Sequence, residues 1–362
     1  MSAVLVRDLA LEQWPSMDRY AAALAARLPG VTVPDEWRTM GGPRYLTRYW
    51  RYPRRLRRYR GDLVHVLDHS YAHCLGAFPG VPSVVTVHDL QPLRTLAEDG
   101  GRLRSLVRDP LLRWSLGWVK RADRVIVSTG FTAHEVEQFL GVPAERIRRI
   151  AYGVDEAFFA RAPDSAIAAT RARWRAALGR GGDAERVVLH VGSCIPRKNV
   201  EAAIGALGLL RARGLDAVLV QVGGAFGPAH RRAIAEAGVE AHVLQEPALA
   251  DDELLVAYYA ADALVIPSSF EGFGMPALEA MAAGLPVVTS GAGGLREAIG
   301  DAGIAVMATS AMAIAEGLHR VLTDPASAAE LRARGLVRAR SFQWDDIAKQ
   351  TRAVHDELRA GA

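Results

Sequence analysis

Short apolar runs and amphipathic helical stretches alternate along the whole of this 362-residue chain. The apolar runs are rich in valine and leucine and do not alternate with polar residues, which indicates strands buried on both faces. Between them, apolar residues recur at helical spacing, as in 21–28, 200–213 and 252–260. The predicted strands are Val4–Val6, Leu63–Leu67, Val84–Val87, Val125–Val127, Val187–Val191, Val218–Val222, Ala263–Ile266 and Pro286–Thr289. This pattern predicts an α/β fold with parallel sheets covered by helices.

A polar break near the middle of the chain predicts two domains. Gly153–Ala177 reads as a loop and then a helix, Gly179–Gly182 as a polar turn, and a new strand begins at about Arg186. The length allows two cores of ordinary size. We predict an N-terminal domain over 1–165, a C-terminal domain over 166–340 and a final helix within 341–362 that packs back on the N-terminal domain.

Composition indicates the cellular compartment in which the protein is expected. No run of eighteen apolar residues predicts a membrane span, and the acidic residues near the N-terminus do not fit a signal peptide. The two cysteines, Cys74 and Cys194, cannot form a disulfide framework and fit a reducing cytoplasm. We therefore expect a cytoplasmic location.

The strand Ala263–Ile266 runs into a glycine-containing loop and a helix that together carry two glutamates. Glu271 lies in the loop, and Glu279 lies about one turn into the helix, with Pro276 at its start. Glycines let a ligand approach the backbone, and free amides at a helix start favour anions or hydroxyl oxygens. Parallel sheets bind ligands at the carboxyl ends of strands. The two carboxylates therefore suit the vicinal hydroxyls of a sugar and a ribose; a capping and a solvated glutamate are the alternative.

A second strand end leads through Gly192 and Ser193 to Arg197 and Lys198 at a helix start. Arginine grips phosphate bidentately and lysine adds a compact charge, whereas a helix N-terminus disfavours basic side chains. The pair therefore indicates a bound anion, with a solvated basic turn as the alternative. Lys198 is one of only three lysines among 44 basic residues, which favours the functional interpretation.

Together these segments resemble the retaining GT-B-fold glycosyltransferases of glycosyltransferase family 4. The spacing from Glu271 to Glu279 matches the family signature, and so do the turn Pro196–Asn199 and the segments Ser128–Thr132 and Tyr152–Asp155. The resemblance covers essentially the whole chain and is strongest over 185–305. It implies two facing Rossmann-like domains with a cleft between them, the acceptor on the N-terminal domain and the donor nucleotide on the C-terminal one.

The resemblance also implies a role for each site residue. Arg197 and Lys198 would hold the donor diphosphate, Glu279 the ribose, and Glu271 with the loop backbone the transferred sugar. His88, at a strand's carboxyl end, would reach that sugar; a purely structural histidine is the alternative. The expected catalytic residues are His88, Arg197, Lys198 and Glu271. The expected donor-binding residues are Gly192, Ser193, Arg197, Lys198, Glu271, Gly272, Phe273, Gly274, Met275 and Glu279.

Two segments depart from a plain family member. Many relatives carry a glycine-rich turn after the first strand, but Glu12–Tyr20 contains no glycine, so its contact with the diphosphate is open. Arg44–Arg60 contains eight arginines, five aromatic residues and no acidic residue. Such a segment can lie on an anionic membrane surface; an acidic glycan, nucleic acid and a merely solvated basic face are the alternatives. We expect no nucleic-acid partner.

The expected activity is retaining transfer of a sugar from a nucleotide-diphosphate sugar to a glycan or lipid-linked acceptor. GDP-mannose is slightly favoured over a UDP-sugar, from resemblance to mannosyltransferases of surface-polysaccharide and lipopolysaccharide assembly. No metal or other cofactor is expected, because Asp251-Asp252 and Asp345-Asp346 read as helix caps. The rivals are a hydrolase with the same glutamates, a GT-B epimerase or phosphorylase, and a non-catalytic sugar-nucleotide or membrane-surface binding protein. A dinucleotide-binding oxidoreductase fits poorly, because Gly291–Gly294 matches the Gly-x-Gly-x-x-Gly motif of that class only loosely.

Overall fold

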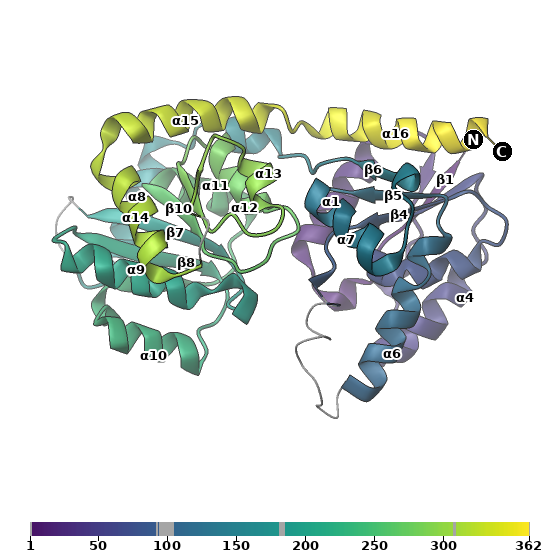
Figure 1. Cartoon of the computed structure of the whole chain (residues 1–362), viewed down its shortest axis with the longest axis horizontal. Coiled ribbons are helices and arrows are strands. Elements are labelled where there is room, and N and C mark those ends of the chain that lie inside the picture. Colours follow the sequence, from purple (N-terminus) through teal and green to yellow (C-terminus); the bar gives the residue numbers. More distant parts are fainter. Residues whose placement is uncertain (1, 92, 94–104, 181–184, 307–308, 362) are drawn as a thin grey trace. The chain divides into compact units, whose positions relative to one another are not determined.

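The computed structural model describes residues 2–91, 93, 105–180, 185–306 and 309–361, which form two compact units (Figure 1). Unit 1 comprises the residues up to Gly153 and those from Trp344 onward, and unit 2 comprises Val154–Gln343. The first boundary lies twelve residues before the predicted one at 165, because Val154 already pairs with Gln343 and Phe158 packs on Tyr258. The C-terminal helix belongs to unit 1.

Unit 1 is built on six parallel strands in the order β2-β1-β3-β4-β5-β6. The strands are β1 (Ala3–Val6), β2 (Val31–Thr32), β3 (Leu63–Val66), β4 (Ser83–Val87), β5 (Arg124–Val127) and β6 (Ile147–Arg149). Since β1 neighbours both β2 and β3, the strand order reverses direction between β1 and β3. A crevice at the carboxyl ends of these two strands is the expected ligand position in such a sheet.

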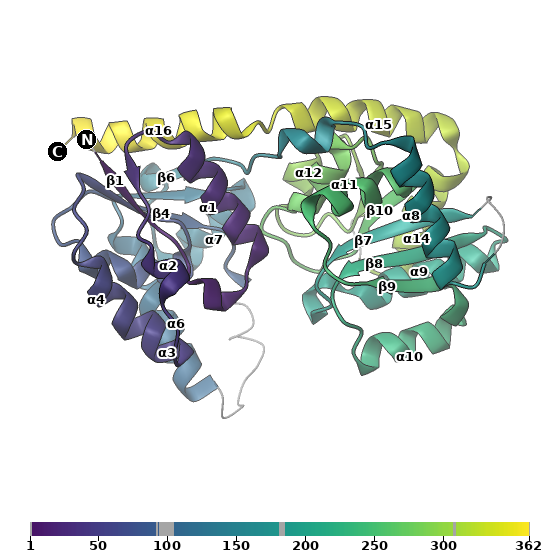
Figure 2. The ribbon, with the colours of Figure 1, turned by 180° about the vertical axis from the view of Figure 1, so that it is seen from behind.

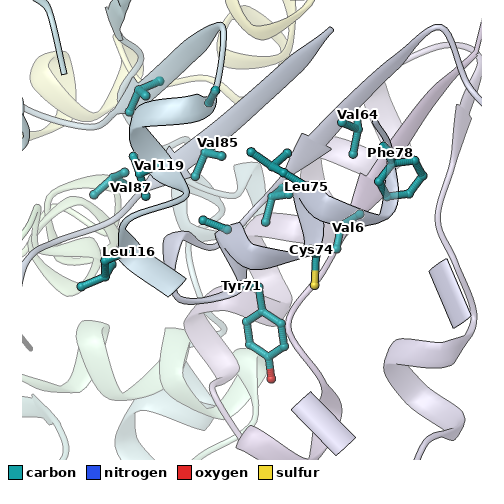
Figure 3. Close-up of a cluster of buried hydrophobic side chains, with 14 of the residues drawn as sticks. Val6, Val64, Tyr71, Cys74, Leu75, Phe78, Val85, Val87, Leu116 and Val119 are labelled. Atoms are coloured by element: carbon teal, nitrogen blue, oxygen red, sulfur yellow. The ribbon is translucent and has the colours of Figure 1, made fainter. Parts of the chain in front are cut away.

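Alternate residues of the unit 1 strands face two different helical layers. Val6, Val64, Val85 and their equivalents form a core with Cys74 and other residues of a 3-10 segment at His69–Ala77 (Figure 3). On the opposite face, His65 contacts His355 of the C-terminal helix. The helices of unit 1 are α1 (Pro15–Arg27), α2 (Glu36–Thr39), α3 (Arg44–Leu46), a π-helical turn (Thr47–Arg51), α4 (Tyr52–Leu56), α6 (Ser105–Leu116), α7 (Gly130–Leu140) and α16 (Trp344–Ala360).

Unit 2 also contains six parallel strands, in the order β12-β11-β10-β7-β8-β9. The strands are β7 (Arg186–Gly192), β8 (Ala217–Gly223), β9 (Val243–Glu246), β10 (Ala263–Ile266), β11 (Val287–Thr289) and β12 (Ile304–Ala305). Read from β9, this is the strand order of a dinucleotide-binding Rossmann sheet, and it reverses direction between β7 and β10. The sequence-predicted α/β class with parallel sheets is therefore confirmed.

Helices cover both faces of the unit 2 sheet (Figure 2). They are α8 (Asp164–Ala177), α9 (Val200–Ala212), α10 (Pro228–Ala237), α11 (Asp251–Ala260), α12 (Met275–Ala282), α13 (Leu295–Ile299), α14 (Ala311–Thr323) and α15 (Pro325–Arg340). Local capping sets several ends: Asp324 accepts backbone hydrogen bonds from Ala326 and Ser327 at the start of α15. No helix in the described parts of the chain is long and apolar enough to cross a membrane.

Candidate functional site

The site in unit 2 lies where the strand order reverses. The loop after β7 carries a 3-10 turn, Pro196–Lys198, and Asn199 then adopts a left-handed conformation with φ +50° before α9 begins. The Asn199 side-chain amide donates to the carbonyl oxygens of Pro267 (3.1 Å) and Thr309 (2.8 Å). The backbone N–H of Ser269 donates to the Arg197 carbonyl at 2.8 Å. These bonds fix the loop after β7 against the loop after β10.

The centre of the site is the carboxylate of Glu271, whose two oxygens are both occupied. Lys198 Nζ lies 2.5 Å from Oε1, and Ser268 Oγ donates to the same oxygen at 2.8 Å. Arg197 Nη1 lies 3.1 Å from Oε2 and also donates to the Phe270 carbonyl at 3.2 Å. Three residues predicted from two separate motifs, Arg197 and Lys198 from one and Glu271 from the other, therefore meet in one cluster. The sequence did not indicate that Glu271 pairs with both cations.

Electrostatics in this cluster favour a charged carboxylate. Burial alone would raise the pKa of Glu271, but Lys198 and Arg197 outweigh it and hold the pKa below its usual value. Near Lys198 and Glu271, burial lowers the pKa of His190 to about 3, and the charge of Lys198 acts in the same direction. His190 is therefore neutral, and its buried Nδ1 has no hydrogen-bond partner among the described residues. The cluster keeps two cations beside one carboxylate, so it retains net positive charge.

Glycines bring the site backbones close together. Gly274 has φ +105° at the N-terminus of α12, where a Cβ would lie 2.4 Å from Leu295 Cδ2. Gly293 has φ +62°, and a Cβ there would lie 2.2 Å from the Glu271 carbonyl oxygen. The N–H of Gly294 donates to that same oxygen at 2.8 Å. The loop Gly291–Gly294 thus supports the Glu271 loop.

The remaining predicted donor-site residues lie on the same loops. Gly192 ends β7 with φ +144°, and Ser193 is exposed beside it. Gly272 and Phe273 are buried, and Gly274 and Met275 are partly exposed at the start of α12. Glu279 is only 1% exposed and accepts a 2.8 Å hydrogen bond from the Tyr258 hydroxyl. A ribose-binding role for Glu279 stays a prediction, and Tyr258 orients its carboxylate.

His88 lies at the carboxyl end of β4 in unit 1, where both ring nitrogens are engaged. Nε2 lies 2.7 Å from the Leu67 carbonyl, which can only accept, so Nε2 carries the hydrogen. The Tyr152 hydroxyl then donates to Nδ1 at 2.5 Å. Burial lowers the pKa of His88, although Asp68 opposes this. The ring is thus neutral and held in place within unit 1, and its contact with a donor sugar stays a prediction.

The glycine-free loop after β1 is held by the buried carboxylate of Glu12. Glu12 accepts hydrogen bonds from Arg48 (3.2 Å), from the Tyr71 hydroxyl (2.8 Å) and from Arg44. Gln13 takes the left-handed conformation, φ +57°, that a glycine would adopt more easily. Two arginines of the basic segment therefore have a structural role.

Sequence reasoning missed four residues of the unit 2 site. Ser268 and Asn199 lie inside the quoted motifs and could have been singled out as polar residues at strand and helix boundaries. Tyr258 and Gly293 come from segments distant in the sequence, so only the packing of α11 and of the loop after β11 reveals them.

Comparison with known proteins is consistent with this geometry. Residues 11–158 match the family model described as Glycosyltransferase Family 4, and residues 171–338 match the model described as Glycosyl transferases group 1. The chain is 33% identical over 293 residues to a D-inositol 3-phosphate glycosyltransferase of Acidothermus cellulolyticus, covering 78% of this chain and 63% of that one. It is 29% identical to an MMP alpha-(1->4)-mannosyltransferase of Mycolicibacterium hassiacum, covering 97% and 86% respectively. Among solved structures, Anabaena HepE in complex with UDP-glucose matches with a TM-score of 0.78, 19% identity and 99% and 100% coverage.

The two Rossmann-like units, with a cationic site at a strand-order reversal, define the GT-B class of fold. Family models match both units, and the chain belongs to the family 4 glycosyltransferases of this class. The match to the inositol-phosphate enzyme spans less than two thirds of that relative's length.

Proposed function

We propose that the protein transfers a sugar from a nucleotide-diphosphate sugar to a glycan or lipid-linked acceptor. The observation that carries the proposal is the cluster of Arg197, Lys198 and Glu271 at the carboxyl ends of β7 and β10. Two cations on the turn that precedes α9 suit a diphosphate leaving group. GDP-mannose and UDP-sugars both fit this chemistry; a mannosyltransferase relative gives GDP-mannose a slight preference.

We propose that the reaction retains anomeric configuration without a protein nucleophile. Glu271 is the loop carboxylate that a double displacement would use, but Lys198, Ser268 and Arg197 already occupy both its oxygens. In the proposed step the acceptor oxygen bonds to the anomeric carbon as the bond to the leaving phosphate oxygen breaks. The same phosphate takes the hydroxyl proton, while Arg197 and Lys198 stabilise its growing charge. These cations supply the positive charge, so we propose that no metal or other cofactor is needed.

The proposal places the protein in the cytoplasm, peripherally at an anionic membrane surface. Free thiols at Cys74 and Cys194 suit a reducing compartment. The basic, aromatic composition of Arg44–Arg60 suits contact with anionic lipid. Membrane contact would give access to a lipid-linked acceptor.

A thermal-shift panel tests the donor assignment. UDP, GDP, ADP, TDP and their sugar conjugates would be compared on the wild type and on Glu279→Gln, which keeps an acceptor for the Tyr258 hydroxyl. A nucleotide at a hundred times its dissociation constant should stabilise the wild type by about 2.7 kcal/mol. The variant should lose this effect. A panel with no stabilising nucleotide would contradict the proposal.

Product analysis separates the two remaining alternatives. A transferase forms a new glycoside only when an acceptor is present, whereas an epimerase changes the donor sugar without one. A non-catalytic binding protein would be stabilised by the nucleotide and form neither product.

A further inference from the structure

An aromatic patch on unit 1 is exposed to an unusual degree. We define the patch as Tyr45, Leu46, Trp50 and Trp114, with exposed fractions of 49%, 51%, 57% and 49%. Only eight large hydrophobic side chains are exposed among the described residues, and four of them are in this patch. Clustered exposed apolar side chains mark interaction surfaces more often than scattered ones do.

Ring contacts through Tyr49 connect Tyr45, in the basic segment, with Trp114 on α6. Tyr45 stacks on Tyr49, with ring centroids 6.3 Å apart and 9° between the planes. Tyr49 contacts Trp114 edge-on at 6.3 Å, and Trp114 also contacts the buried ring of His73 at 5.4 Å. Trp114 lies on α6, more than fifty residues beyond the basic segment. The patch is therefore a feature of the fold that no linear motif shows.

The structure separates the arginines beside the patch into two groups. Arg44 and Arg48 bind Glu12, and Arg58 binds Glu36. Arg54, Arg55 and Arg57 are exposed and have no carboxylate partner in the described parts of the chain. The Arg54 guanidinium lies 3.6 Å from the centroid of the Trp50 ring. Uncompensated positive charge therefore borders the patch directly.

We infer that the aromatic patch and Arg54, Arg55 and Arg57 form a docking face for an anionic lipid surface. Tryptophan and tyrosine favour the headgroup region of a bilayer, where an apolar ring and a polar edge are both accommodated. Arginines next to them are attracted by anionic lipid headgroups. The charge and the aromatic composition thus suit the same occupant. The face comprises α3, the π-helical turn, α4 and the end of α6.

The position of this face deepens the proposed function, on which this step rests. Arg48, inside the same segment, donates to the Ser70 carbonyl at 2.7 Å. Ser70 in turn bonds to Asp68, which lies two residues after the carboxyl end of β3 at Val66. The docking face is therefore linked to the edge of unit 1 at which a parallel sheet binds its ligand. A lipid-linked acceptor held at the membrane would be presented near this edge.

Vesicle sedimentation of the full chain tests the docking face. The lipids would be phosphatidylcholine alone or mixed in equal parts with phosphatidylglycerol. The wild type should bind the mixed vesicles and lose binding at high salt. Arg54→Gln should weaken binding about fivefold. Trp50→Ala and Trp114→Ala should each weaken it severalfold. Phe139→Ala is the matched control, because Phe139 is 52% exposed on α7 outside the patch.

Two outcomes would overturn the inference. One is a wild type that binds neither kind of vesicle. The other is a Trp114→Ala variant that binds with wild-type affinity, because the arginine segment alone would then account for the binding. Should Trp114→Ala misfold, Trp114→Gln, which keeps more of the side-chain volume, carries the same expectation. The nucleotide panel uses no membrane, so a failure of this inference is distinct from a failure of the proposed function.

Discussion

Replacing Lys198 by alanine should separate catalysis from stability. In the fold, the Lys198 ammonium serves mainly the Glu271 carboxylate, which keeps Arg197 at 3.1 Å and Ser268 at 2.8 Å when the lysine is gone. Losing one of several partners of a buried charged group costs about 1–3 kcal/mol. In the reaction, Lys198 would stabilise charge that develops on the leaving phosphate. Removing one such preorganised group costs about 3–4 kcal/mol, or roughly 10²–10³ in turnover.

Two measurements on the same variant test this. Steady-state turnover is measured with the donor identified by the nucleotide panel, and the free energy of unfolding by urea titration at the same pH. Lys349→Ala is the matched control, because Lys349 is an exposed lysine that pairs with Asp346 one helical turn away. That control should leave both quantities unchanged. Turnover within tenfold of wild type for a folded Lys198→Ala would refute the assigned role.

Two further predictions concern Asp8 and Gly293. Burial, reinforced by Asp68 and Asp18, raises the pKa of Asp8 to about 7. The folded state therefore keeps a proton that the unfolded chain releases at about pH 3.8. The free energy of unfolding accordingly falls as the pH rises from about 4 to 7. Asp8→Asn should therefore gain up to about 4 kcal/mol over wild type at pH 8 but little at pH 4 in urea titrations, and an equal gain at both would contradict this. Gly293→Ala should lower the free energy of unfolding by more than about 2 kcal/mol and abolish nucleotide stabilisation. The control Gly141→Ala has a similar positive φ but nothing within 4 Å of its Cβ, so it should cost only about 1–2 kcal/mol. Equal losses in the two variants would show that the contact with Glu271 is unimportant.

The strands that the sequence predicts are all interior to the two sheets, and the four that it misses are their edges. The missed strands are β2, β6, β9 and β12, at the two ends of each strand order. Interior strands such as β3 and β10 are buried along their whole length and therefore appear as apolar runs. An edge strand such as β6, Ile-Arg-Arg, is partly exposed and carries no such run. The pattern of burial thus limits what periodicity alone can detect.

The domain boundary shows a different limit. The sequence predicts it near residue 165, because Gly153–Ala177 reads as a loop followed by a helix. In the structure that loop contributes side chains to unit 2: Phe158 packs on Tyr258, and Asp155 caps a short 3-10 helix. A loop belongs to the unit on which its few apolar side chains are buried, and the sequence does not say which unit that is.

The residues predicted for the unit 2 site could be singled out from the sequence because their types and strand-end positions are local features. The charge balance of the site could not be predicted, because Glu271 meets Lys198 and Arg197 only when β10 lies beside β7. This pairing has a chemical consequence. Without donor, Glu271 holds both cations in place on the folded scaffold, so little reorganisation is needed when phosphate arrives. A diphosphate can bind Arg197 and Lys198 through the donor groups that Glu271 does not use. Glu271 Oε2, which accepts from Arg197, has a second lone pair that can accept from a sugar hydroxyl. The same carboxylate can thus position the cations before the donor binds and hold the transferred sugar afterwards.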